Sequence, residues 1–304
     1  MKTTDRRTVL KAGIGALAGL ASVPLWSAQT SRLSLQPVAG KVSVISGAPG
    51  NVVVLSSDDG MLLVDSGTAE LARAVKASLG GARVHTLFNT HYHADQTGGN
   101  ALFAKDGAVI HAHLITRQWL ATDYYVPAQD RWVKAQPAVA LPTVTFRQRG
   151  DLKVGAENVE YGYLLEAHTR GDIYVYFHDS NVLAVGDVAS PQRDPLLDWY
   201  TGAWLGGRVD AMDELLALAN ADTRIVPAYG PVMSRAELKA ERDVMAKLYD
   251  RTTLLTTQGQ SAQDMLDGGV MKEVDRKFED PYRFLYDVCK GNWAHYTNFG
   301  GNIV

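Results

Sequence analysis

The stretch NTHYHADQTGGN, residues 89–100, places His91, His93 and Asp95 at alternate positions. In an extended backbone, side chains two residues apart project from the same face. Two imidazoles and a carboxylate that project together suit a divalent metal. A His-x-His pair alone fits packed or exposed histidines equally well, so the sequence around it has to decide.

Short valine-rich runs precede this stretch and predict strands at 41–46, 51–57 and 61–67. Residues 68–81 predict a helix, because Leu71, Val75 and Leu79 recur at four-residue spacing before a glycine pair. A further strand, 83–90, delivers the chain into the histidine stretch.

The rest of the chain repeats this arrangement. A short helix is expected at 101–107, a strand at 108–112, a helix or helical loop at 114–125 and irregular chain from Pro127 to Pro142. A second run of strands is expected between 143 and 187, followed by a helix at about 208–218, a strand at 224–230 and helices from Arg235 onward. Two strand-rich halves that each lead into helices predict a duplicated α/β layout.

Polar residues recur where these strands end. Asp65, His168, Asp187 and Tyr229 all follow apolar runs. Loops at strand ends are where α/β folds gather their functional groups, so we expect these side chains to meet the histidine stretch. As an aspartate at a strand end, Asp65 is expected to accept hydrogen bonds from backbone N–H groups.

Five motifs in order resemble those of the metallo-β-lactamase superfamily, from about Val42 to Val244: the strand-end Asp65, then HYHADQ, AHTRGD, VGD and PAYG. The resemblance implies a four-layer αβ/βα sandwich with a metal site at one edge of its sheets. We expect this domain to span 38–304, including a helical extension over about 235–304.

The resemblance assigns the metal ligands residue by residue. His91, His93 and His168 match the three histidines of the first metal. Asp187 matches the aspartate that bridges the ions in two-metal relatives, and whether it becomes a direct ligand beside one metal stays open. Asp65 takes the family's supporting position, which hydrogen-bonds the metal-site loop rather than ligating. The second metal of the family takes the aspartate matched by Asp95 and two histidines, which are here Gln96 and Tyr229. An amide and a neutral phenol are poor zinc ligands, so we expect one zinc per chain.

A zinc held by three neutral histidines keeps one position for water, which ionises near pH ~7. Asp95 is then free to orient that water and to pass its proton to a leaving group. Tyr229 and Gln96 are expected to donate hydrogen bonds to a developing oxyanion. The sequence therefore predicts a hydrolase that directs zinc-bound hydroxide at an ester, lactone, amide or β-lactam-like bond.

Two other functions remain open. His91, His168 and Asp187 form a two-histidine, one-carboxylate set suited to iron(II), and persulfide dioxygenases of the same superfamily use such a set. Such enzymes usually keep the histidine that Gln96 replaces. A metal-dependent binding or accessory protein without catalysis is the third possibility.

Aromatic residues cluster in two segments, and in the family such segments often wall the substrate cleft. The expected pocket residues are Trp119, Tyr124, Trp199, Tyr200 and Trp204. They favour a small-molecule substrate with an apolar or ring portion.

The N-terminus predicts export. Residues 1–28 hold paired arginines in RRTVLK and then an apolar run too short to span a bilayer comfortably, which resembles a twin-arginine signal. We expect the twin-arginine export machinery as a partner, a periplasmic location, and no stable membrane span in the mature protein, which stays anchored only if the signal is not cleaved.

Composition excludes a nucleic-acid partner. The net charge of the whole chain is −3, and the first eleven residues hold four basic side chains and one acidic one, so the remainder carries −6. A single cysteine, Cys289, excludes an intrachain disulfide.

Overall fold

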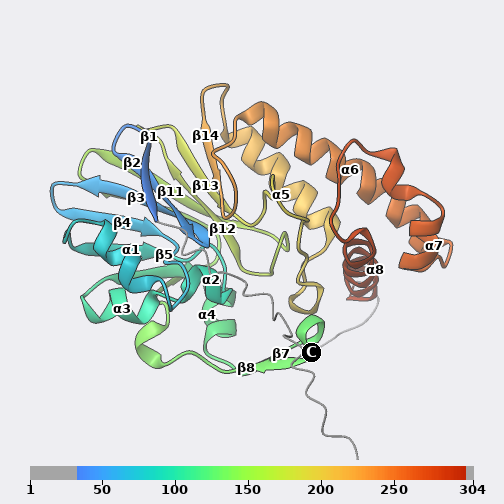
Figure 1. The fold of residues 1–304 in the computed structure, drawn as a ribbon, viewed down its shortest axis with the longest axis horizontal. Helices are drawn as coiled ribbons and strands as arrows, with labels where there is room; N and C mark the ends of the chain where they lie inside the picture. Colours follow the sequence, from blue (N-terminus) through green and yellow to red (C-terminus); the bar gives the residue numbers. More distant parts are fainter. Residues whose placement is uncertain (1–32, 299–304) are drawn as a thin grey trace, which may run out of the picture. The chain divides into compact units, whose positions relative to one another are not determined.

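The structure is a computed structural model that describes residues 33–298. The predicted export signal, 1–28, lies outside the described residues. Figure 1 shows two sheets of the described chain with helices on their outer faces.

The first sheet has seven strands in the order β1-β2-β3-β4-β5-β6-β9. Its strands are β1 (Ser34–Ala39), β2 (Val42–Ala48), β3 (Gly50–Ser57), β4 (Gly60–Val64), β5 (Val84–Phe88), β6 (Val109–His113) and β9 (Val144–Phe146). The first four pair antiparallel, and β4, β5, β6 and β9 run parallel. The helices of this half are α1 (Ala72–Ser78), α2 (Ala94–Thr97), α3 (Asn100–Lys105) and α4 (Leu114–Leu120).

The second sheet has five strands in the order β10-β11-β12-β13-β14. These are β10 (Arg149–Val154), β11 (Glu157–Leu164), β12 (Asp172–Phe177), β13 (Val182–Gly186) and β14 (Arg224–Pro227). Only the last pair, β13 with β14, is parallel. Its helices are α5 (Leu205–Leu218), α6 (Arg235–Thr257), α7 (Ala262–Asp267) and α8 (Pro281–Asn298).

The central strands are apolar along their whole length because both of their faces are buried. In β3, Val53 and Leu55 pack between the two sheets, whereas Val52 and Val54 pack under the helices of the first half. In β13, Val182 and Ala184 face the other sheet, and alternate residues face the helices of the second half. These layers confirm the predicted αβ/βα sandwich.

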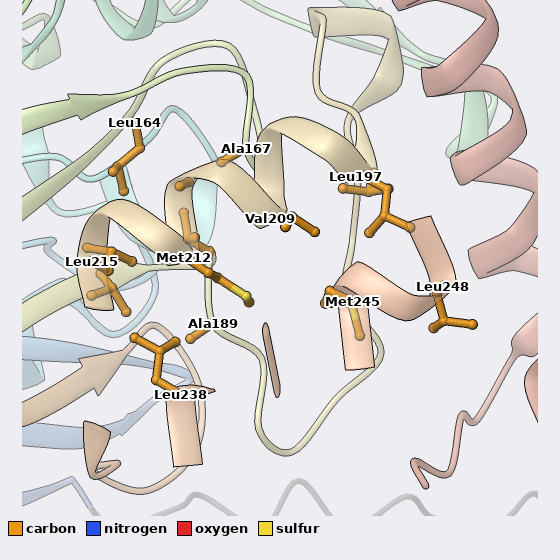
Figure 2. Packing of buried hydrophobic residues seen from close by; sticks show 14 of the residues in the cluster. Leu164, Ala167, Ala189, Leu197, Val209, Met212, Leu215, Leu238, Met245 and Leu248 are labelled. Atoms are coloured by element: carbon orange, nitrogen blue, oxygen red, sulfur yellow. The ribbon is translucent and has the colours of Figure 1, made fainter. Parts of the chain in front are cut away.

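The outer face of the second sheet is covered by the C-terminal helices. Figure 2 shows Val209, Met212 and Leu215 of α5 in the same apolar layer as Met245 and Leu248 of α6. Residues of α8 join this core at Leu285 and Val288. The helical C-terminal segment is therefore part of the sandwich core rather than a separate attachment.

Three details differ from the sequence-based expectation. The first sheet begins with β1, before residue 38, and Pro37 is tolerated there because β1 is an edge strand. Strand β9, expected in the second half, pairs with β6 in the first sheet. The segment expected to be irregular contains strand β8 (Arg131–Val133), which forms a hairpin with β7 (Tyr124–Val126).

Within residues 33–298, no helix combines the length and the apolar character that a bilayer crossing requires.

Burial of α8 predicts its contribution to stability. Leu285 is fully buried in the second core, whereas Leu254 of α6 is 48% exposed. Leu285→Ala is expected to lower the free energy of unfolding by about 2–5 kcal/mol, because it removes buried methyl groups and leaves a cavity. Leu254→Ala, the matched control in another helix, is expected to change it by less than about 0.5 kcal/mol. Denaturant titration measures both, and equal small losses would mean that α8 does not belong to the folded core.

Candidate metal centre

The candidate site forms where several strands end at one edge of the two sheets. Asp65 follows β4, His91 follows β5, Asp187 follows β13 and Tyr229 follows β14. His168 comes from the loop between β11 and β12. The parallel pairs β4–β5 and β13–β14 bring these strand ends together from both halves, as the positions of the polar residues predicted.

Three imidazole nitrogens point at one another. His93 Nδ1 lies 3.0 Å from His91 Nε2 and 3.2 Å from His168 Nε2. His91 and His168 are completely buried, whereas His93 is partly exposed. Nitrogens bound to a tetrahedral zinc at 2.0–2.1 Å lie roughly 3.3 Å apart, so the spacing fits such an ion.

The opposite nitrogen of each ring has its own acceptor. His91 Nδ1 lies 3.0 Å from Thr90 Oγ1, His168 Nδ1 lies 2.8 Å from the Leu196 carbonyl, and His93 Nε2 lies 2.7 Å from Asp198 Oδ2. Each outer nitrogen therefore donates its N–H outward, and three lone pairs remain directed at a common point. That arrangement is repulsive unless a positive charge lies among them, so these residues fit a metal cation.

The pKa values of the three histidines indicate where the cluster carries a positive charge. Burial and the neighbouring His93 lower the pKa of His91 to about 4, and burial lowers the pKa of His168 well below its usual value. Burial would also lower the pKa of His93, but the Asp198 carboxylate outweighs it and raises that pKa to about 9. Without metal, the positive charge of the cluster is a proton on His93.

Asp198 is a residue of the candidate site that the sequence analysis missed. Its carboxylate accepts hydrogen bonds from the hydroxyls of Tyr92 and Tyr200 in addition to His93. Burial raises its pKa, but the charge of His93 prevails and holds it at about 2. Asp198 and His93 lie 105 positions apart, and nothing in the local sequence of Asp198 indicates the pairing.

Asp65 supports the histidine loop, in agreement with its expected role. It accepts hydrogen bonds from Thr90 N at 2.8 Å and from Thr90 Oγ1 at 2.7 Å, and the same hydroxyl oxygen accepts from His91. Burial raises the pKa of Asp65 to about 8, although both bonds from Thr90 oppose this. Gly186 allows the close packing, because a Cβ there would lie 2.9 Å from the Thr90 side chain and its φ is +56°.

Asp187 joins the three histidines as a fourth potential ligand. Its Oδ2 lies 3.8 Å from His91 Nε2 and 3.6 Å from His168 Nε2, and all four ligand atoms lie within 4.8 Å of one another. The same oxygen accepts a hydrogen bond from Arg193, which the sequence analysis did not single out.

Asp95, Gln96 and Tyr229 form the adjoining part of the site. The Tyr229 hydroxyl donates to Asp95 Oδ2, and Gln96 Nε2 lies 3.4 Å from the same oxygen. Gln96 is completely buried, and its Oε1 has no hydrogen-bond partner among the described residues. Both side chains therefore point at Asp95. The oxyanion role expected from the sequence would require them to point into open space for a substrate.

A cleft of about 550 Å³ opens over the site. His93, Asp95, Asp198, Tyr124 and Tyr200 all line it. The β7–β8 hairpin adds Val126, Arg131 and Val133, which the sequence analysis had assigned to irregular chain or not considered.

The three tryptophans expected in the pocket lie elsewhere. Trp119 stacks on Tyr92, with ring centroids 5.4 Å apart, and so packs behind the wall. Trp204 stacks on His295 of α8 at 3.5 Å, and Trp199 lies near Lys290. Trp199 and Trp204 therefore pack against helix α8, whereas Trp119 packs against the histidine stretch.

Convergent imidazoles and a carboxylate at the edge of an αβ/βα sandwich define a class of metal-binding proteins. The family model of the metallo-beta-lactamase superfamily matches residues 45–230, and the chain belongs to this superfamily.

Individual relatives share the fold and a moderate part of the sequence. The chain is 26% identical over 267 residues to the 2,4-dinitroanisole O-demethylase subunit alpha of Nocardioides sp. (strain JS1661), covering 84% of this chain and 71% of that protein. It is 27% identical over 206 residues to the metallo-beta-lactamase type 2 of Bacillus cereus, covering 65% and 73%.

Solved structures resemble the chain at lower identity. A metallo-beta-lactamase from Pontibacter korlensis has a TM-score of 0.57 at 21% identity, covering 70% of this chain and 99% of that one. The stereoselective inverting sec-alkylsulfatase from Pseudomonas sp. has a TM-score of 0.62 at 18% identity, covering 89% and 51%.

The pairing of His93 with Asp198 predicts an effect on metal affinity. Asp198→Asn is expected to weaken zinc binding about 10- to 100-fold, because the amide accepts the His93 N–H without a charge. Equilibrium titration with zinc measures the change. Asp58→Asn, at a fully exposed carboxylate, is the control. Unchanged affinity in Asp198→Asn would remove Asp198 from the metal centre.

Proposed function

We propose that the chain is a metal-dependent hydrolase with one zinc ion held by His91, His93 and His168. The observation that carries this proposal is the set of three lone pairs that the outward hydrogen bonds of the imidazoles leave directed at one point. Structural zinc sites fill all four positions with protein ligands, whereas three histidines next to a cleft leave one position for water.

When bound, zinc supplies a Lewis acid that makes a water nucleophilic near neutral pH. Asp95 is the general base of the proposal, because it lines the cleft together with His93. Tyr229 and Gln96 both contact Oδ2 of its carboxylate. The other oxygen, Oδ1, is then oriented to take a proton from water and return it to the leaving group.

Tyr229 and Gln96 act in this proposal as positioning residues for Asp95. Burial and the Asp95 charge raise the pKa of Tyr229, so its hydroxyl keeps its proton and remains a donor. This replaces the oxyanion role that the sequence alone suggested for the two residues.

The substrate we propose is a small molecule with a ring or apolar portion and an ester, lactone, amide or β-lactam-like bond. Tyr124, Tyr200 and the valines of the β7–β8 hairpin supply apolar wall. The relative that covers most of this chain is named for an O-demethylase acting on 2,4-dinitroanisole, so aryl methyl ethers belong in the same substrate panel.

An iron dioxygenase is less well supported. The set His91, His168 and Asp187 would use a carboxylate whose Oδ2 is paired with Arg193 and lies 3.6–3.8 Å from the two imidazole nitrogens, although its Oδ1 has no hydrogen-bond partner among the described residues. His93 Nδ1 is closer to both, which favours the three-histidine set.

We also propose that the protein is exported to the periplasm through the twin-arginine route, on the evidence of residues 1–28 alone. Metal loading before export is compatible with that route, because it carries folded proteins.

Metal removal tests the proposed chemistry. Purified protein is expected to hold about one zinc per chain by elemental analysis and to hydrolyse at least one member of an ester, lactone, amide, β-lactam and aryl methyl ether panel. A chelator is expected to abolish turnover and zinc to restore it. His168→Ala, which removes one ligand, is expected to lose both zinc and turnover.

Each other result has a definite meaning for the proposal. Iron in the purified protein, with oxygen consumption on a thiol or persulfide, would replace the hydrolase by a dioxygenase. Zinc binding without turnover on the whole panel would instead favour a metal-dependent binding protein.

Asp95→Asn is expected to lower kcat about 10²- to 10⁴-fold, because the amide cannot accept a proton from water. Zinc content is expected to stay at one per chain, since Asp95 is not one of the three histidine ligands proposed for the zinc. Steady-state kinetics and elemental analysis on the same sample measure both quantities. Loss of zinc together with activity would make Asp95 a ligand and contradict its role as a base.

A further inference from the structure

Arg193 lies within the acidic part of the site. Its guanidinium donates to Asp187 Oδ2, and its Cζ lies 3.6 Å from the centroid of the Tyr229 ring. The Tyr229 hydroxyl in turn donates to Asp95. Arg193 therefore joins the two carboxylates beside the histidines, one by direct contact and the other through a tyrosine.

The side chain of Arg193 is held in place on several sides. Only 32% of it is exposed, and the Asp187 carboxylate that it meets is 1% exposed. A guanidinium stacked on an aromatic face and paired with a buried carboxylate is a fixed positive charge rather than a mobile surface group. An arginine guanidinium stays protonated at any working pH, so the charge persists.

Two carboxylates next to a three-histidine metal centre would otherwise attract a second divalent ion. Asp187 Oδ2 is paired with Arg193, so the guanidinium already neutralises a carboxylate whose Oδ1 has no hydrogen-bond partner among the described residues. A guanidinium at this position also repels a second cation directly and cannot be exchanged or chelated.

We propose that Arg193 is a built-in cation that takes the place of a second metal and limits the site to one ion. The proposal rests on the three-histidine centre proposed above and goes beyond it by assigning the limit to a charge. The Gln96 and Tyr229 substitutions remove ligands from the second position, whereas Arg193 supplies the positive charge that the carboxylates require. On this account, a restored ligand alone does not restore a second metal.

Zinc stoichiometry tests this assignment without depending on turnover. The variants are Gln96→His, which restores an imidazole beside Asp95, and Gln96→His combined with Arg193→Met or Arg193→Lys. Methionine keeps an apolar stem against the Tyr229 ring but has no charge, and lysine keeps the charge without the planar fork. Each protein is dialysed against a fixed free zinc concentration and analysed for zinc per chain.

The proposal predicts one zinc for the unchanged chain, for Gln96→His and for Gln96→His/Arg193→Lys, and two for Gln96→His/Arg193→Met. The first zinc reports an intact fold in every variant, and Gln96→His/Arg193→Ala is a second neutral replacement if the methionine does not pack. Two zincs in Gln96→His would overturn the proposal, because the arginine would then not exclude a second ion.

One zinc in both neutral double variants would also overturn it, since removal of the charge would have no effect. No zinc in the unchanged chain would instead overturn the proposed metal centre itself, so failure of the two proposals is distinguishable.

Discussion

His93 Nδ1 lies 3.0 Å from His91 Nε2 and 3.2 Å from His168 Nε2, and the rest of the site is arranged to keep these nitrogens together. Lone pairs directed at one another repel unless a positive charge lies among them, so hydrogen bonds from outside the cluster have to hold the rings in place. Asp198, the Leu196 carbonyl and the pair Asp65–Thr90 do this by fixing one N–H of each ring outward. Without metal, a proton on His93 supplies the positive charge among these nitrogens, so binding of a metal ion exchanges that proton for the ion.

Much of this arrangement could be predicted from local sequence. Alternation of His91 and His93 after a strand, and valine-rich strands buried on both faces, are signals that neighbouring residues carry. The positions of Asp65, Asp187 and His168 at strand ends followed from the same periodicity. The family resemblance then set the topology, which periodicity alone leaves open.

The remainder depends on contacts between distant parts of the chain. In the sequence, Asp198 is one aspartate in an aromatic loop and Arg193 is an ordinary loop residue. Only the fold shows that Asp198 contacts His93 and that Arg193 contacts Asp187. Trp204 is a residue type that often lines pockets. It instead stacks on His295 of the last helix, because the helices of the second half cover that loop. Side-chain type was a good guide to chemistry and a poor guide to which layer a residue faces.

Because of the β7–β8 hairpin, part of the cleft lining comes from a different element than the histidines do. Among the described residues the two strands of the hairpin form a sheet of their own, yet they line part of the same cleft as His93. The histidines depend on the central strands, which tolerate little change, whereas the hairpin can vary in length and side chains without disturbing either large sheet. Substitutions in the hairpin can therefore change which molecules the cleft accepts while the metal centre stays constant.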